Sequence, residues 1–335
     1  MTGHDGVCRA ARCRSTGARA CWRVVTLVVL AEAGGCRRGD EPSDTEKTAT
    51  APPSSSVTSS PGVAPPAPEL VAAPDAEVMP EPRCRPDMVK VTPHDGPRYC
   101  VDRYEATLVE HATSRPLSPY YTPVRKWAVN AFDAWSKQRF EFGPPESQQV
   151  ELPELPAWQR TVDVEPRALS KKALWPNGHV TGVLAATACS HAGKRLCTPA
   201  EWRTACGGEP GHRFPYGASY EAGACNVFRE AHPAAVLHGD ASIGHNDPRL
   251  NRVNFKGKPL LRKTGDTPSC ASRWGDDAIF DMVGNLDEWV EHERGSFAGG
   301  FYARSTKDGC DWRSTAHPKS YADYSTGVRC CSALP

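Results

Sequence analysis

The sequence lacks a net charge of either sign, because 40 Lys and Arg residues balance 39 Asp and Glu residues and leave a formal net charge of +1 at pH 7. A field this weak does not attract nucleic acid, so we expect no nucleic-acid partner. Long apolar runs are also missing: the run at 24–31, VVTLVVLA, is too short to cross a bilayer as a helix. No two cysteines have the spacing CxxC, which argues against a structural zinc site.

The N-terminus has the pattern of an export signal. The apolar run follows several arginines and precedes EAGGC, which ends at Cys36. Cleavage after Ala33 fits the small-x-small rule, whereas cleavage before Cys36 fits a bacterial lipoprotein box with Ala33 in place of the usual Leu. Ten cysteines follow Cys36, an even set that can pair fully, so a retained Cys36 would have no partner. We therefore predict a signal peptide with a lipobox at 1–36, and lipidation of Cys36.

The predicted location follows from this signal. The protein is expected to be exported and anchored in the membrane at the periplasmic or outer cell surface, with secretion as the alternative. A cytosolic protein with a misread start codon would leave ten thiols without a purpose. Residues 37–83 are rich in Pro, Ala, Ser, Thr and Glu, as in APPSSSVTSSPGVAPPAPE, and cannot bury enough surface to fold. We predict a disordered tether there, kept extended by its prolines.

The folded domain is predicted to begin at Cys84. Residues 84–107 alternate on both sides of a Pro/Gly turn, which predicts a hairpin that a Cys84–Cys100 disulfide could close. Residues 108–175 form an irregular insertion, in which 126–140 place Trp127, Phe132 and Trp135 at helical spacing, with core packing as the expected role.

Two short helices are predicted next. Residues 181–196 indicate a helix that stops at Gly193. The capping box TPAE begins a second helix, which runs through Cys206. In this box the side chains of Thr198 and Glu201 each accept a hydrogen bond from the other residue's backbone amide. From 207 onward, Gly, Pro, Asn and Asp recur every few residues. This part is expected to be rich in loops and to need covalent or metal staples.

The stretch DMVGNLDEW at 281–289 has two carboxylates, Asp281 and Glu288, on either side of a turn. Calcium prefers carboxylates and backbone carbonyls on a sharply turned segment, and Gly284 permits a turn that directs its own carbonyl and that of Leu286 inward. These residues predict a calcium site. The alternative is a solvated turn whose acids cap a neighbouring loop.

Several motifs together resemble the sulfatase-modifying-factor family, which includes the formylglycine-generating enzymes. They are CVDRYEAT (100–107), AGKRLCTPAEWRTACGG (192–208), FPYG (214–217), CNV (225–227), DMVGNLDEW (281–289), AGGFYAR (298–304) and GVRCC (327–331), in the family's order. The resemblance implies an α+β fold at 84–335, a variant of the C-type lectin fold that is rich in loops and held by disulfides, with the insertion at about 108–175.

The resemblance also implies metal ligands and disulfides. The family binds calcium at positions that match Asp281, Gly284, Leu286 and Glu288, and a second calcium site begins at positions that match Asn226 and Val227. The family bridges its first helix to its last strand, which maps to Cys189 and Cys330.

The copper chemistry of the family requires two thiolates, the first four residues after a Gly-Gly pair and the second five residues later. Counting from Gly299 and Gly300 gives Arg304 and Gly309, with Cys310 one place beyond. Copper is therefore not expected. Cys310 is a weak candidate for a displaced ligand, and the simpler reading is a disulfide with Cys206, since the family bridges that helix to this strand.

A non-haem iron site is a weaker alternative. Such a site needs two histidines and one carboxylate. The loop-like stretch 231–247 contains five candidates for these ligands: His232, His238, His245, Asp240 and Asp247.

The predicted function is a calcium-stabilised module that binds a protein, peptide or glycan ligand and has lost the formylglycine-generating activity. A metal-dependent oxidoreductase is the alternative. Three tryptophans that adjoin motifs are expected in the core, Trp202, Trp274 and Trp289, while Arg195 and Arg329 are expected to anchor loops.

Overall fold

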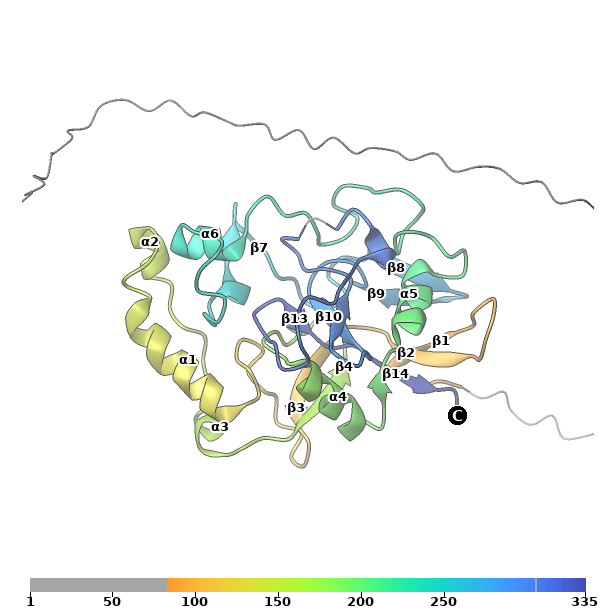
Figure 1. The fold of residues 1–335 in the computed structure, drawn as a ribbon, viewed down its shortest axis with the longest axis horizontal. Coiled ribbons are helices and arrows are strands. Elements are labelled where there is room, and N and C mark those ends of the chain that lie inside the picture. Colours follow the sequence, from red (N-terminus) through yellow and green to blue (C-terminus); the bar gives the residue numbers. More distant parts are fainter. Residues whose placement is uncertain (1–82, 305) are drawn as a thin grey trace, which may run out of the picture. The chain divides into compact units, whose positions relative to one another are not determined.

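The structure, a computed structural model, describes residues 83–304 and 306–335 (Figure 1). The predicted signal peptide, the lipidation site Cys36 and nearly all of the predicted tether lie outside the described residues. Within the described part, no helix is both long enough and apolar enough to cross a membrane.

The first sheet joins the two ends of the domain. It has four strands in the order β1-β2-β14-β5, all antiparallel to their neighbours, with β1 at Met88–Val91, β2 at Tyr99–Asp102, β14 at Cys330–Ala333 and β5 at Arg195–Leu196. Strands β1 and β2 form the predicted hairpin, in register from Met88 opposite Asp102 to Val91 opposite Tyr99.

The second sheet carries the 281–289 motif. Its order is β12-β11-β10-β13, with β12 at Arg313–Ser314, β11 at Ser296–Ala298, β10 at Asp287–Val290 and β13 at Thr326–Gly327. Three two-stranded sheets complete the strand content, formed by β3 (Ala106–Glu110) with β4 (Pro166–Ser170), β6 (Asn254–Phe255) with β7 (Lys258–Pro259), and β8 (Ala271–Trp274) with β9 (Asp277–Phe280).

The helices are short, and several of their ends follow from local sequence. Helix α5 (Pro199–Gly207) starts with the predicted capping box, since the Thr198 side chain accepts from the Glu201 amide and the Glu201 side chain accepts from the Thr198 amide. Helix α4 (Gly182–His191) ends two residues before Gly193, whose φ of +66° belongs to the left-handed region that follows many helices. The remaining helical segments are α1 (Arg125–Gln138), α2 (Pro145–Gln148), α3 (Ala157–Thr161), α6 (Pro233–His238), η1 (Leu250–Arg252) and η2 (Gly309–Asp311).

The region 108–175 is more regular than expected. It contains α1, α2 and α3, and β4, which pairs with β3 along five residues from Ala106 opposite Ser170 to Glu110 opposite Pro166. Alternate residues of β4 are buried, as one face of a strand requires. In Figure 1 these helices lie at the opposite side of the domain from the first sheet.

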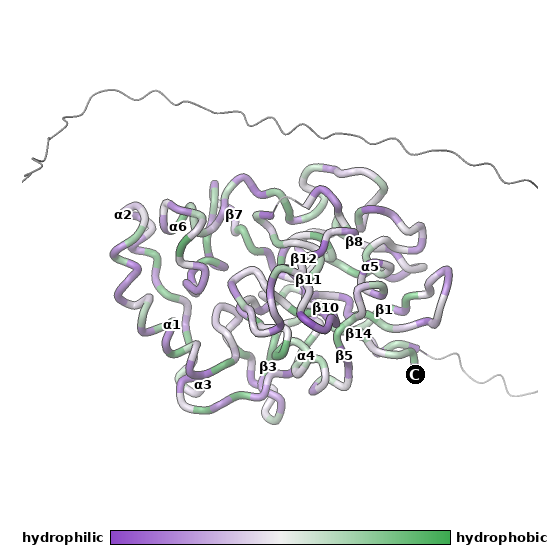
Figure 2. The backbone as a smooth tube through the Cα atoms, in the orientation of Figure 1, coloured by the Kyte–Doolittle hydropathy of each residue, from purple (hydrophilic) through white to green (hydrophobic). Residues whose placement is uncertain are grey.

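The core is built around aromatic residues and disulfides. Trp202 and Trp274 pack in one buried cluster, and Trp289 in another, as predicted. Figure 2 shows hydrophobic segments gathered around α4 and β14, and hydrophilic ones at the tip of the hairpin that follows β1.

Five disulfides hold these elements together. Three are the pairs expected above, Cys84–Cys100, Cys189–Cys330 and Cys206–Cys310. The other two, Cys197–Cys331 and Cys225–Cys270, were not assigned from the sequence.

Candidate functional site

The turn at 281–289 has an unusual backbone. Asp281, Gly284 and Asn285 have φ angles of +61°, +83° and +60°, and Asp and Asn are among the few residues with side chains that adopt this region readily. Gly284 is required for a second reason: a Cβ atom there would lie 2.2 Å from the Asn226 carbonyl oxygen. The turn is therefore packed directly against the segment that contains Asn226.

This packing brings the two predicted calcium segments together. The Asn285 amide donates to the Asn226 carbonyl at 2.9 Å, and Asn226 Nδ2 donates to Asn285 Oδ1 at 3.0 Å and to the Leu260 carbonyl at 2.9 Å. Both partners of Nδ2 are acceptors, which fixes the orientation of the Asn226 amide. Its Oδ1 atom is consequently buried without a hydrogen-bond donor.

Glu288 is held by neutral and cationic donors. Trp202 Nε1 donates to its Oε2 at 2.6 Å, and the Arg329 guanidinium contacts both carboxylate oxygens at 2.7–2.9 Å. Arg329 also donates to the carbonyls of Asp102 and Phe280, the last residues of β2 and β9, so it holds the ends of two strands rather than loops. All of these side chains are buried.

A third carboxylate, Glu105, joins the same buried cluster and was not singled out from the sequence, although it lies within the motif CVDRYEAT. It accepts from Asn285 Nδ2 at 2.5 Å and from the Leu286 amide at 2.9 Å, while Asp281 accepts from the Gly265 amide at 2.7 Å. Burial, reinforced by Asp281 and Glu288, raises the pKa of Glu105 well above its usual range. Burial also raises the pKa of Asp281 to about 7.

The cluster has more carboxylates than cations, and this excess of negative charge is relevant to the predicted calcium site. Three buried acids, Glu105, Asp281 and Glu288, lie near two guanidiniums: Arg329, which bonds to Glu288, and Arg262, which acts on Asp281 from farther away. The acids still outnumber the cations, which favours a bound proton or a further cation in the cluster. The unpartnered Oδ1 of Asn226 is an oxygen of the kind that calcium binds. Glu288, by contrast, is already paired with Arg329, and in the described part of the chain the three acids are not arranged to hold a metal ion by themselves. Calcium binding by Asp281, Gly284, Leu286, Glu288, Asn226 and Val227 stays a prediction.

The residues at the family's copper position do not suit copper. Arg304 lies where the first thiolate is expected, with its Nη2 atom donating to Asp287 Oδ2 at 3.1 Å and its guanidinium 4.8 Å from the Trp312 ring centre. Cys310 is bonded to Cys206. Every cysteine in the described part of the chain is in a disulfide, so no thiolate is available there for copper(I).

The five residues considered for iron are dispersed among other partners. Asp247 receives three hydrogen bonds from the Arg249 guanidinium and lies 3.3 Å from His238 Nε2. His232 Nε2 is 2.9 Å from the Tyr324 hydroxyl, and His245 Nε2 is 2.8 Å from the Ala241 carbonyl. Asp240 accepts from Ser242. Within residues 83–304 and 306–335, no three His, Cys, Asp or Glu side chains are arranged to hold a metal ion, so these residues do not fit an iron triad.

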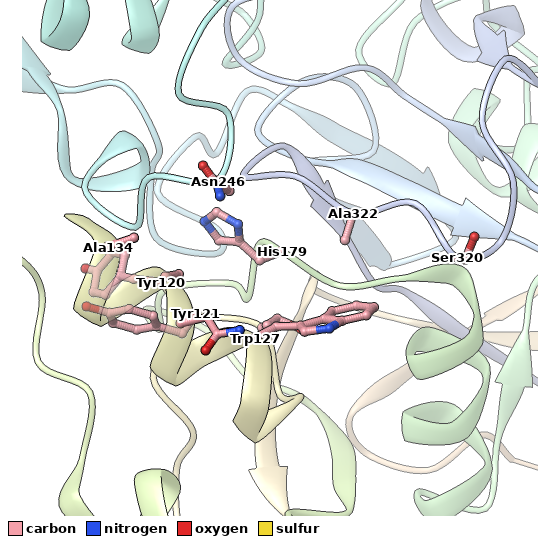
Figure 3. Close-up of a pocket in the computed structure, with 11 residues that line it drawn as sticks. Tyr120, Tyr121, Trp127, Ala134, His179, Asn246, Ser320 and Ala322 are labelled. Carbon is pink, nitrogen blue, oxygen red and sulfur yellow. The ribbon is translucent and has the colours of Figure 1, made fainter. Parts of the chain in front are cut away.

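A pocket of about 410 Å³ lies beside α1. It is lined by α1 and by four loop segments, through Tyr120, Tyr121, Thr122, Trp127, Asn130, Ala131, Ala134, His179, Asn246, Ser320 and Ala322 (Figure 3). The core role expected for the aromatic residues of α1 is wrong for Trp127, which is 49% exposed at this pocket, and correct for Trp135, which is buried. The helical periodicity identified the apolar residues of α1. It could not show that a pocket lies between α1 and loops that are distant in the sequence.

Comparisons with known proteins give two structural similarities and one family match. The crystal structure of CarF is 13% identical over 71% of this chain and 87% of CarF, with a TM-score of 0.30. The structure of PvdO from Pseudomonas aeruginosa is 14% identical over 74% of this chain and 92% of PvdO, with a TM-score of 0.33. None of the curated proteins matches in sequence. The sulfatase-modifying factor enzyme 1-like domain matches residues 87–333, a range that includes 108–175. The α+β, loop-rich fold with five disulfides is thus confirmed, and the chain belongs to the sulfatase-modifying-factor family.

Proposed function

We propose that this protein is an exported binding module, anchored to the membrane through Cys36, in which the formylglycine-generating chemistry of the family has been lost. The observation that carries the proposal is the Cys206–Cys310 disulfide together with Arg304 at the position of the first thiolate. The five disulfides support export, because such bonds persist in oxidising compartments.

The replacement of the copper ligands has a clear chemical consequence. Copper(I) is a soft ion that is held by thiolates, and a guanidinium offers it only positive charge. The carboxylate beside Arg304 is Asp287, which is fully buried and whose pKa burial raises to about 7. This ion pair occupies the region in which the family would activate oxygen, so binding rather than oxidation is the function that remains.

We expect no conversion of a sulfatase-type cysteine to formylglycine. The full-length protein is incubated with copper(I), oxygen and a peptide carrying the sulfatase motif, and the aldehyde is sought by mass spectrometry. A formylglycine-generating enzyme serves as the positive control. Turnover that persists in the wild type and disappears in Cys310→Ser would contradict the proposal, because it would mean that Cys310 leaves its disulfide and acts as a ligand.

We also propose that calcium stabilises the domain at Asp281 and its neighbours. A ligand that binds only the folded state at about 100 times its Kd adds about 2.7 kcal/mol to the free energy of unfolding. At about 2–4 °C per kcal/mol, removal of calcium should lower Tm by about 5–10 °C. Thermal unfolding with calcium and with a chelator measures this shift, and Asp281→Asn should reduce it. An unchanged Tm, with no calcium found by elemental analysis, rejects the calcium site, while a bound transition metal favours the oxidoreductase.

A further inference from the structure

The pocket beside α1 has no charged lining residue. Its polar atoms come from hydroxyl, amide and imidazole groups, and its walls from Tyr120, Tyr121 and Trp127. Burial lowers the pKa of His179 to about 4, although Asp323 and Asp247 act in the opposite direction, so the imidazole is neutral at physiological pH. The volume of the pocket, about 410 Å³, lies within the range of small-ligand sites. An ion in this pocket would lose its hydration without gaining a counter-charge.

His179 is held in an unusual state at the inner wall of the pocket. Its φ is +58°, a conformation that bulky residues rarely adopt, and its amide donates to the Asp323 carbonyl at 2.8 Å. Only 7% of the residue is exposed, and its Nε2 atom is buried without a hydrogen-bond partner. Strained backbone and unsatisfied buried nitrogen each cost free energy, and they coincide at one residue that lines a pocket. Figure 3 shows the ring among Tyr121, Trp127, Asn246 and Ala322.

The other polar groups are oriented in part by contacts outside the pocket. Asn246 Oδ1 accepts from Trp135 Nε1 at 3.2 Å, which leaves the Asn246 amide hydrogens as donors. The Tyr121 hydroxyl donates to the Pro153 carbonyl at 2.8 Å, so that residue offers mainly its ring. Asn130 on α1 is exposed and adds an amide with both donor and acceptor atoms. The pocket thus combines aromatic faces with neutral groups that donate and accept hydrogen bonds.

We propose that this pocket binds a neutral hydroxylated ring, a saccharide unit, with Trp127 packing against the ring and His179 turning slightly so that its buried Nε2 atom reaches the pocket and bonds to one of the hydroxyls. This inference rests on the proposed binding function and names its site and ligand class. A hydroxyl group both donates and accepts, so it satisfies either tautomer of neutral His179. The C–H face of a sugar ring suits the exposed face of an aromatic side chain.

The test is calorimetric titration of the full-length protein with neutral disaccharides built from glucose, galactose and N-acetylglucosamine. At least one should bind, and Trp127→Ala should weaken its Kd by about tenfold or more, as expected for a central aromatic contact. Phe140→Ala is the matched control, because Phe140 has the same 49% exposure and does not line the pocket. A disaccharide with a uronic acid in place of the binding sugar should bind about tenfold more weakly or worse, since no cationic residue lines the pocket.

Three results would overturn the inference. The first is that no neutral disaccharide binds. The second is that the wild type and Trp127→Ala bind the disaccharide equally well. The third is that tetramethylammonium or a peptide binds at Trp127 and no sugar does. These results are distinguishable from failure of the proposed function. Aldehyde formation from the sulfatase peptide would refute the loss of catalysis and leave saccharide binding standing, whereas no aldehyde and no saccharide binding would refute this inference alone.

Discussion

Replacing Arg329 with Met should lower the free energy of unfolding by about 3–5 kcal/mol, the loss typical of removing one partner from a buried ion pair. The side chain is fully buried and donates to Glu288 and to the carbonyls of Asp102 and Phe280. Without it, the Glu288 carboxylate keeps only the Trp202 indole as a donor. Urea unfolding measures the change, which should appear as a lower midpoint at an unchanged m value.

Two variants make this result specific. Arg125→Met removes the exposed Arg125–Asp163 pair by the same substitution, and should change the free energy of unfolding by at most about 1 kcal/mol. Glu288→Gln combined with Arg329→Met removes the unpaired charge and keeps an acceptor for Trp202, so it should restore part of the stability. A loss in Arg329→Met no larger than that in Arg125→Met would show that the buried cluster does not depend on its cation.

The parts of the fold that depend on neighbours in the sequence were predictable. The capping box at Thr198 and Glu201 forms because both hydrogen bonds are made within four residues. Gly193 ends its helix because its left-handed backbone does not continue one. The Cys84–Cys100 pair was predicted from the hairpin, although Cys100 lies opposite Lys90 and it is the turn before β1, closed by the Met88 amide on the Arg85 carbonyl, that brings Cys84 back to β2.

Long-range placement was not predictable from the residues alone. The Cys197–Cys331 bond depends on β5 and β14 meeting at a sheet edge, and two residues at β5 give no periodicity to detect. Glu105 lies 180 residues from Asn285 in the sequence, yet the two share a hydrogen bond in the buried cluster. The pocket likewise requires α1 to meet His179 and the segment at 320–322. Family resemblance supplied Cys189–Cys330 and Cys206–Cys310, because it carries information about contacts that one sequence lacks.

Removing the Cys189–Cys330 disulfide should cost much less than its sequence separation of 141 residues suggests, because the Cys197–Cys331 disulfide spans almost the same part of the chain. With Cys197–Cys331 intact, the bond between α4 and β14 closes a loop of only about 10 residues, through 189–197 and 330–331, for which the chain-entropy relation gives about 3 kcal/mol. Both sulfurs are buried in the core cluster that contains Trp289, so Cys189→Ala with Cys330→Ala avoids placing hydroxyls there. At about 2–4 °C per kcal/mol, the double variant should lose about 6–12 °C in Tm.

The matched control is Cys84→Ala with Cys100→Ala, which opens a loop of only 16 residues and should cost about 3 kcal/mol. The two double variants should therefore lose similar amounts of stability, because each removes one disulfide that closes a short loop. Peptide mapping under non-reducing conditions must first show that the other four disulfides remain paired. A loss from the Cys189→Ala and Cys330→Ala variant that exceeds the control by about 2 kcal/mol or more would contradict the entropic argument. The stability of the domain would then come mainly from how the bridges pack in the core, a contribution that loop length does not measure.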